Sequence, residues 1–274
     1  MLTFTKMNNL ESLVKKSVLG DKKALEQVVI QIQDLIYNLA IRMLWHPDDA
    51  KDATQDILIK VITNLSSFQH KSSFKTWVYR LATNTLINYK KKKHLNSINF
   101  EQYELQLHKG FSNSIGYTNN KAEQNLLIQE AKIGCSNAML QCLNQDNRIT
   151  YIIGEILEFN STEGAIILDI SSETFRKRLS RSKKSLHNFL NKNCGIINSE
   201  NKCKCYKKVD NSIKKGIIQP NNLLFSNNIK NITLINKIEN IQKEVYLYQT
   251  NPNYFAPDTL LLEVKRILSL TNNL

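Results

Sequence analysis

Residues Ser72–Lys93 read SSFKTWVYRLATNTLINYKKKK, and this stretch decides how the rest of the chain is interpreted. Apolar and aromatic side chains recur in it at steps of three and four residues, which places them on one stripe of an α-helix. They are Phe74, Trp77, Val78, Leu81, Ala82, Thr85, Leu86 and Tyr89. The opposite face is predicted to carry Lys75, Tyr79, Arg80, Thr83, Asn84 and Asn88. Such a helix can lie against a phosphate backbone, but a solvated surface helix fits the pattern equally well.

Composition predicts a helical protein with a polyanionic partner. Hydrophobic residues make up 42% of the 274 positions, which is enough for a sizeable core. The formal net charge of +13 favours nucleic acid or an acidic membrane surface as partner. With only eight glycines and four prolines, hairpin turns are scarce, so we expect an all-α fold. We see no apolar signal core and no segment long enough for a membrane span, and we therefore expect a cytoplasmic protein.

Three helices are predicted ahead of the opening stretch. Leu10–Leu19 and Asp21–Leu44 have helical periodicity, with Asp21 as an N-cap, and Pro47 should end the second helix. A further helix starts at Asp48 and carries acidic and amide side chains in its first turns: Asp49, Asp52, Gln55 and Asp56. An acidic cluster at this place commonly complements the helix dipole, but it could also form a docking face for a basic partner.

The second half of the chain predicts a helix-turn-helix. Helices are expected at Ala122–Leu143, Arg148–Phe159 and Thr162–Leu168, and a break at Asp169–Ser171 precedes a basic helix. Phe175, Leu179, Leu186 and Leu190 should face the core, whereas the outward side chains are Arg176, Lys177, Ser180, Arg181, Lys183 and Lys184. Arginine can pair bidentately with guanine and lysine can hold phosphate, which suits a recognition helix. A surface helix of a bundle is the alternative.

These two regions together resemble a known family, the bacterial extracytoplasmic-function sigma factors. Asp48–Lys93 is similar to the family's second conserved region, in the residues Thr76, Trp77, Tyr79, Arg80, Ala82 and Asn84. Ile170–Leu186 is similar to its fourth region, in the residues Thr174, Phe175, Arg176, Arg178, Leu179 and Arg181. Asp169 stands where the family usually has glycine, and Asp enters left-handed backbone conformations more readily than most residues. Gly164 stands where an apolar residue is usual.

The resemblance implies a sigma factor that binds core RNA polymerase, recognises and helps melt promoter DNA, directs transcription initiation, and has no catalytic site of its own. Core polymerase would dock on Asp49, Asp52, Gln55 and Asp56. The minus-10 element would be bound by Lys71, Lys75, Arg80, Asn84, Lys90 and Lys91, with the Gln69–Ser73 loop capturing an unstacked base. The minus-35 element would be bound by Ser172, Thr174, Arg176, Lys177, Ser180, Arg181 and Lys184. An anti-sigma factor is a further candidate partner.

The expected organisation is two small helical domains joined by a linker, followed by an extension. Residues 8–93 would form sigma region 2, residues 94–120 the linker and residues 121–190 the helix-turn-helix of region 4. Residues 191–274 would form a cysteine-containing helical extension that regulates polymerase or promoter binding in cis. Within it we expect a helix at Ile232–Tyr248 and another after Asp258.

The five cysteines argue against a disulfide framework, because their number is odd and we find no export signal. Cys194, Cys203 and Cys205 are candidate ligands for zinc or another thiophilic metal, with His187, Cys142 or Cys135 as a fourth ligand. Redox sensing and plain buried thiols are the other interpretations, so no cofactor is firmly implied.

Two alternatives to a sigma factor remain. A stand-alone helix-turn-helix regulator would bind duplex DNA without polymerase, but it would not need the region at Asp48–Lys93. A metal or redox sensor, or an enzyme built on the cysteines, would need a catalytic base or partner signature that we do not find.

Overall fold

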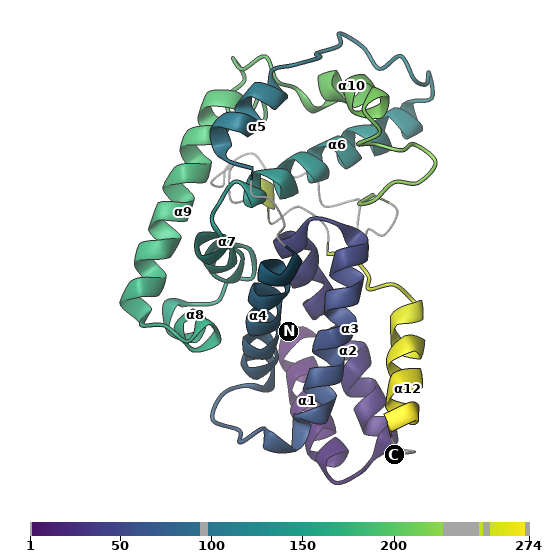
Figure 1. The fold of residues 1–274 in the computed structure, drawn as a ribbon, viewed down its shortest axis with the longest axis vertical. Helices are drawn as coiled ribbons and strands as arrows, with labels where there is room; N and C mark the ends of the chain where they lie inside the picture. The colour runs from purple at the N-terminus through teal and green to yellow at the C-terminus, as the bar shows by residue number, and fades with distance from the viewer. Residues whose placement is uncertain (1, 94–97, 227–246, 249–252, 272–274) are drawn as a thin grey trace. The chain divides into compact units, whose positions relative to one another are not determined.

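The computed structural model describes residues 2–93, 98–226, 247–248 and 253–271, and regular structure in these ranges is helical apart from an isolated bridge between Cys194 and Cys203 (Figure 1). The predicted all-α class is confirmed. The chain divides into two compact units. Unit 1 comprises Met1–Leu95, Thr162–Ser172 and Phe255–Leu274, and unit 2 comprises Asn96–Ser161 and Glu173–Tyr254.

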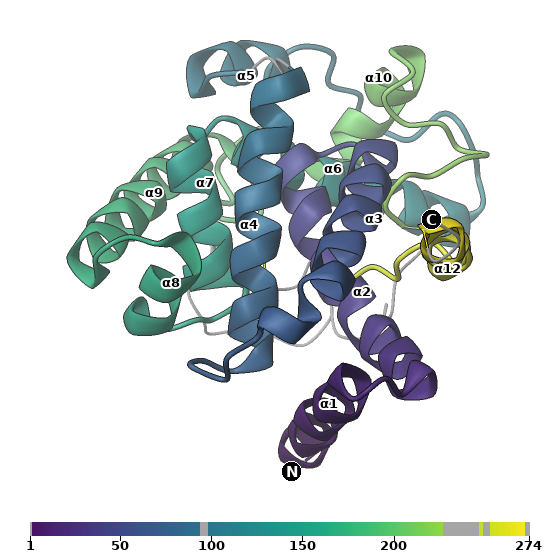
Figure 2. The same cartoon turned by 60° about the horizontal axis from the view of Figure 1, so that its bottom comes forward.

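Unit 1 is a helical bundle. Its helices are α1 (Leu2–Val18), α2 (Lys22–Leu44), α3 (Pro47–Thr63), α4 (Phe74–Lys93), α8 (Ser161–Leu168, of which Ser161 falls in unit 2) and α12 (Thr259–Thr271). Figure 2 shows α2, α3 and α4 side by side. Fully buried apolar side chains from these three helices form the core, among them Ile32, Ile36, Leu39, Ile57, Leu58, Phe74, Val78 and Leu86.

The helix boundaries in unit 1 follow the local signals in the sequence. Asp21 caps α2, because its Oδ1 accepts hydrogen bonds from the backbone N–H groups of Lys23 and Ala24 at 2.9 and 3.0 Å. The helix ends at Leu44, and Trp45 follows with a φ of 70°. Pro47 is the first residue of α3, one residue ahead of the predicted start, since its missing N–H costs nothing at that position.

Unit 2 contains α5 (Phe100–Leu107), α6 (Lys121–Gln141), α7 (Gln145–Tyr151), α9 (Ser172–Asn193, of which Ser172 falls in unit 1) and α10 (Val209–Lys214). Helix α5 lies in the stretch that was expected to be a linker, and a capping box between Asn99 and Gln102 starts it. The helix predicted at Arg148–Phe159 is α7 followed by a π-helical segment, Ile152–Ile156.

The first part of the cysteine-containing extension is built into unit 2. Val209 and Ile218 are buried together with Ile115 and Leu127, so the extension and α6 share one apolar cluster. The buried carboxylate of Glu130 in α6 accepts hydrogen bonds of 2.8 to 3.2 Å from the backbone N–H groups of Leu224, Phe225 and Ser226. The helix predicted at Ile232–Tyr248 falls almost entirely on residues outside the described ranges.

Arg148 holds the end of α6 in unit 2. Its side chain is fully buried, and its guanidinium donates to the carbonyl oxygens of Leu140, Gln141 and Leu143 at 2.8 to 2.9 Å. The last carbonyls of a helix have no partner within the helix and carry partial negative charge, so a buried cation satisfies both needs. Burial lowers the pKa of Arg148 to about 10, which still leaves the guanidinium charged at neutral pH.

Replacing Arg148 should destabilise unit 2. We expect Arg148→Met to lower the free energy of unfolding by about 3 kcal/mol, because the buried carbonyls at the end of α6 lose their donors. Chemical denaturation followed by circular dichroism measures this change. Lys214→Met, at an exposed position of α10, is the matched control and should stay within about 0.5 kcal/mol of the natural chain. Equal losses for the two variants would contradict a capping role.

Candidate nucleic-acid interface

Helix α9 presents a cationic face. Phe175, Leu186 and Leu190 are buried on one side of it, and Leu179, which was also expected in the core, is partly exposed. On the opposite side the side chains of Arg176, Lys177, Ser180, Arg181 and Lys184 are exposed, whereas Ser172 and Thr174 are partly exposed. The five exposed residues therefore occupy one face of the helix and are accessible to a partner, whereas Ser172 and Thr174 lie at the edges of this face.

Contacts on the buried side orient this face. The Ser182 hydroxyl is buried, 2.8 Å from the carbonyl oxygen of Arg178 and 3.0 Å from that of Asn147 in α7. Arg178 pairs with Asp146 at 2.7 Å, so it ties α9 to α7 rather than extending toward solvent. Lys183 was predicted to point outward, but it is partly buried and pairs with Glu155 at 2.9 Å.

Gly154 allows the close approach of α9 to the π-helical segment. A Cβ atom at this position would lie only 2.8 Å from a methyl carbon of Leu179, so a larger side chain would have to displace the side chain of Leu179. No role for Gly154 was predicted from the sequence. A lone glycine within an apolar helical stretch is a usable signal for close helix packing, and here it marks such a contact.

The turn between α8 and α9 has the geometry of a Schellman motif. Asp169 directly follows α8 with a φ of 55°, and the N–H of Ile170 donates to the carbonyl oxygen of Ala165 at 3.1 Å. This 6→1 hydrogen bond around a left-handed residue is how many helices end, usually with glycine at the left-handed position. The expectation that Asp169 tolerates the backbone conformation of the missing glycine is confirmed.

Variants of Asp169 should separate the turn from its side-chain contact. We expect Asp169→Val to destabilise the protein by about 1 to 2 kcal/mol, because a β-branched residue resists positive φ, whereas Asp169→Gly should be tolerated. Both changes remove the carboxylate. Thermal unfolding of the two variants measures the difference, and an equal cost for both would mean that the carboxylate, not the backbone conformation, is what the turn requires.

Helix α4 carries the predicted minus-10 residues in unit 1. Arg80 and Asn84 are exposed, Lys75 is partly exposed, and Lys71 is exposed in the preceding loop. The side chains of Lys90 and Lys91 lie outside the described part of the chain. Two residues of the predicted polar face are corrected: Tyr79 and Thr83 are buried, because α4 is covered on two sides rather than one. The Thr83 hydroxyl lies 3.4 Å from the carbonyl oxygen of Ile167 in α8.

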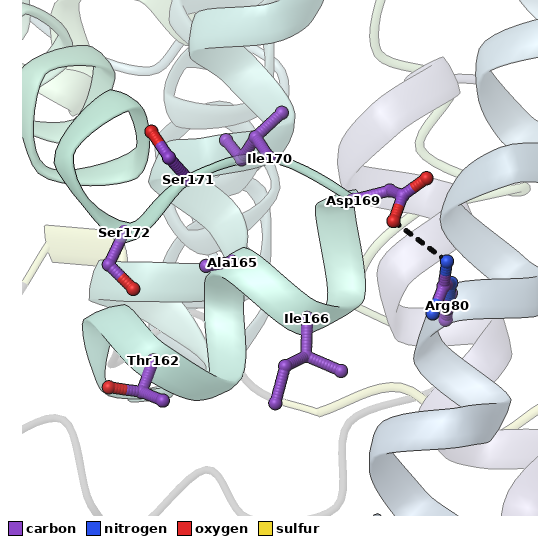
Figure 3. A pocket seen from close by; sticks show the side chains of 8 residues that line it. All are labelled: Arg80, Thr162, Ala165, Ile166, Asp169, Ile170, Ser171 and Ser172. Atoms are coloured by element: carbon purple, nitrogen blue, oxygen red, sulfur yellow. Dashed lines mark hydrogen bonds and ion pairs between the residues drawn. The ribbon is translucent and has the colours of Figure 1, made fainter.

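Arg80 contacts the turn after α8. Its guanidinium donates to Oδ1 of Asp169 at 2.8 Å, beside an open pocket of about 580 Å³ (Figure 3). The pocket is lined by Arg80, Thr162, Ala165, Ile166, Asp169, Ile170, Ser171 and Ser172. The two side chains are 44% and 75% exposed, and ion pairs this exposed contribute little to stability. A phosphate oxygen could therefore replace the carboxylate of Asp169 on Arg80 at small cost.

Two hydrogen bonds fix the point where the loop leads into α4. Ser73 accepts a hydrogen bond from the N–H of Thr76 at 3.1 Å, and Glu11 of α1 accepts one from the N–H of Phe74 at 2.8 Å. Trp77 stacks on Phe74, with ring centroids 5.6 Å apart, so it packs with neighbouring aromatic rings as predicted. The role of Glu11 could not be inferred from the sequence, because it acts on a helix more than sixty residues away.

The acidic side chains of α3 lie near its start, as expected. Asp52 and Asp56 are exposed, and Asp49 and Gln55 are partly exposed. Asp52 and Asp56 are four residues apart, so they occupy one stripe of the helix. The predicted docking residues thus form an accessible, negatively charged surface on unit 1.

The described ranges contain no group of three or more His, Cys, Asp or Glu side chains arranged to hold a metal ion, and this includes the proposed ligands Cys194, Cys203 and Cys205. All five cysteines are free thiols. Burial raises the pKa of Cys203 to about 11 and that of Cys205 to about 12. Both thiols are therefore protonated at neutral pH, which makes them poor nucleophiles.

These pKa values predict slow thiol chemistry. At pH 8 we expect iodoacetamide to label Cys203 roughly 100-fold more slowly in the folded protein than in the urea-unfolded chain, because only the thiolate reacts. The rate should rise about tenfold per pH unit until the pH approaches 11. Mass spectrometry of the labelled peptides measures both rates. Rapid labelling near neutral pH would instead indicate a thiolate of the kind that binds metal or senses oxidants.

A helical protein with an exposed cationic helix behind a tight turn, and a second basic helix in its other unit, has the design of a DNA-binding transcription protein. Residues 28–95 match the family model for sigma-70 region 2. The chain is 27% identical over 186 residues to the ECF RNA polymerase sigma factor SigW of Bacillus subtilis, and this match covers 65% of the chain and 96% of SigW. It is 27% identical over 178 residues to the ECF RNA polymerase sigma-E factor of Escherichia coli K12, covering 64% of the chain and 91% of that protein.

Two solved structures are also similar. CnrH, in complex with the cytosolic domain of CnrY, aligns with a TM-score of 0.47 and 18% identity over 67% of this chain and 98% of CnrH. The sigma factor RpoE of Bartonella quintana, in complex with the anti-sigma factor NepR, aligns with a TM-score of 0.43 and 21% identity over 62% of this chain and 98% of RpoE. Residues 28–95 therefore form a sigma-70 region 2 domain, and the chain is similar to extracytoplasmic-function sigma factors, as the sequence predicted. Within the described ranges, none of the helices is long and apolar enough to cross a membrane.

Proposed function

We propose that this chain is a promoter-specificity subunit that binds core RNA polymerase, recognises two promoter elements, helps to open the DNA and so directs transcription initiation. The observation that carries the proposal is the match of residues 28–95 to sigma-70 region 2. On that segment the acidic side chains of α3 and, on α4, Lys75 and Arg80 are accessible.

The residues of unit 1 would have two tasks. Asp49, Asp52, Gln55 and Asp56 would bind a basic surface of core polymerase. Arg80, Asn84 and the loop at Gln69–Ser73 would hold the opened strand of the minus-10 element, because single strands are bound by cationic grooves and by stacking. Lys71, Lys75, Lys90 and Lys91 would neutralise phosphates there without reading sequence.

The residues of α9 would read the minus-35 element in the major groove. Arg176 and Arg181 are exposed and could pair with guanine through two hydrogen bonds each, while Lys177 and Lys184 could hold phosphates. Ser172, Thr174 and Ser180 could donate hydrogen bonds at the same surface. In this role the chain has no catalytic site of its own and acts in the cytoplasm, where the polymerase works. An anti-sigma factor is a further partner that fits the family.

Run-off transcription with purified core polymerase tests this function. Initiation at a defined start site that depends on the added chain supports it. Binding to duplex DNA without any effect on the polymerase would instead favour a stand-alone helix-turn-helix regulator. Zinc, a chelator and a thiol oxidant are added in separate reactions, because a change in activity with these reagents would favour the alternative of a cysteine-based sensor.

In the same assay, variants of α9 distinguish base reading from charge. Arg176→Ala and Arg181→Ala should each weaken use of the cognate minus-35 element by about 1 to 3 kcal/mol if the arginine pairs with a base. Arg176→Lys and Arg181→Lys keep the charge but lose the paired hydrogen bonds, so they should lose much of the same discrimination. Equal losses on a scrambled minus-35 element would show that these arginines only neutralise phosphate.

A further inference from the structure

The last described helix, α12, packs against α3, the helix that carries the predicted polymerase-docking residues. Figures 1 and 2 both draw α12 beside α3, and the two helices are in direct contact within unit 1. All of α3 and most of α2 lie in the segment matched by sigma-70 region 2. The matches to SigW and sigma-E cover nearly all of those proteins but only about two thirds of this chain, so this chain is longer than the relatives it matches.

Specific polar contacts fix the position of α12. Glu263 pairs with Lys51 of α3 at 2.8 Å, and Lys265 pairs with Glu26 of α2 at 2.6 Å. Just ahead of the helix, the N–H of Ala256 donates to Oδ1 of Asp34 in α2 at 2.8 Å. These three contacts hold α12 against α3, with Lys265 and the segment just ahead of the helix reaching α2.

Apolar burial supplies most of the attachment. Leu260 is fully buried and Val264 is 1% exposed, whereas Leu262, on the other side of the helix, is 67% exposed. Ion pairs as exposed as those of Glu263 and Lys265 contribute little, but a buried leucine contributes much more. The contact can therefore be weakened selectively at Leu260 and left intact by a change at Leu262.

The surface that α12 covers adjoins the predicted docking face. Lys51 and Gln55 are four residues apart, so they share one stripe of α3, and Asp52 and Asp56 form a stripe about 100° around the helix. Gln55 is only partly exposed, in contrast to Asp52 and Asp56. Helix α12 sits on the Lys51 stripe of α3, and an α-helix with its side chains is roughly 10 to 12 Å wide. A partner that contacts Gln55 together with Asp52 would therefore collide with α12.

We propose that α12 is an intramolecular competitor for core RNA polymerase: docked against α3, it blocks the Gln55 edge of the docking face, and it must be displaced before the polymerase binds. This inference rests on the proposed function. It adds an interaction surface on α3 and the neighbouring part of α2, whose occupant is an amphipathic helix with an acidic residue opposite Lys51 and a basic residue opposite Glu26.

The test measures binding of full-length variants to purified core polymerase. Leu260→Asp and, separately, Val264→Asp should release α12 and tighten binding by roughly tenfold, because the binding-competent fraction of the chain rises. The matched control, Leu262→Asp, adds the same charge to the exposed side of α12 and should bind like the natural chain. A synthetic peptide of residues 254–271 should occupy the vacated surface and weaken the binding of the Leu260→Asp variant to core polymerase again. The same peptide carrying Leu260→Asp should have no such effect.

Hydrogen exchange of the α12 and α3 amides is followed in parallel, so that release of α12 is observed independently of the polymerase. If α12 is released in the Leu260→Asp chain but its affinity for core polymerase is unchanged, the competition proposal is overturned. Weaker binding by both release variants, with their other helices still protected, overturns it as well. If no chain binds core polymerase even after α12 is released, the proposed sigma function fails, and the competition proposal fails with it.

Discussion

The buried guanidinium of Arg148 is the contact on which the arrangement of unit 2 depends. It satisfies the carbonyl oxygens of Leu140, Gln141 and Leu143, and so joins the end of α6 to the start of α7. Helix α9 then packs against α7 and the π-helical segment through contacts with Asp146, Asn147 and Gly154. A displacement of α7 would therefore reorient the cationic face of α9.

In unit 1 the corresponding constraint is the start of α4. Ser73, Glu11 and the stacked rings of Phe74 and Trp77 determine where the helix begins. Since side chains on a helix repeat every 3.6 residues, fixing its start and its buried stripe also fixes which residues are exposed. Arg80 and Asn84 are exposed for this reason, and the buried Tyr79 and Thr83 show how far the covering elements extend around the helix.

The sequence predicted what depends on local patterns. The all-α class, the cap at Asp21, the break before Pro47 and the left-handed turn at Asp169 all depend on neighbouring residues, and they were inferred correctly. Features that depend on residues far away in the sequence were either not predicted or predicted wrongly. Thr83 was expected on the polar face but is buried beneath α8, and nothing in its own helix indicates that cover. Helix α5 was missed because its eight residues are too few for a clear periodic signal.

The extension, residues 191–274, contributes buried side chains to the core of unit 1 and to the core of unit 2. Its Val209 and Ile218 bury Leu127 of α6, its backbone satisfies the carboxylate of Glu130, and its Leu260 is fully buried in unit 1. A chain that ended near Leu190 would expose this apolar surface and leave a buried carboxylate without donors, which is costly. The effect of a truncation on stability would therefore mask any effect on regulation. A regulatory role for the extension has to be tested by single changes on α12, where the buried Leu260 and the exposed Leu262 lie two residues apart.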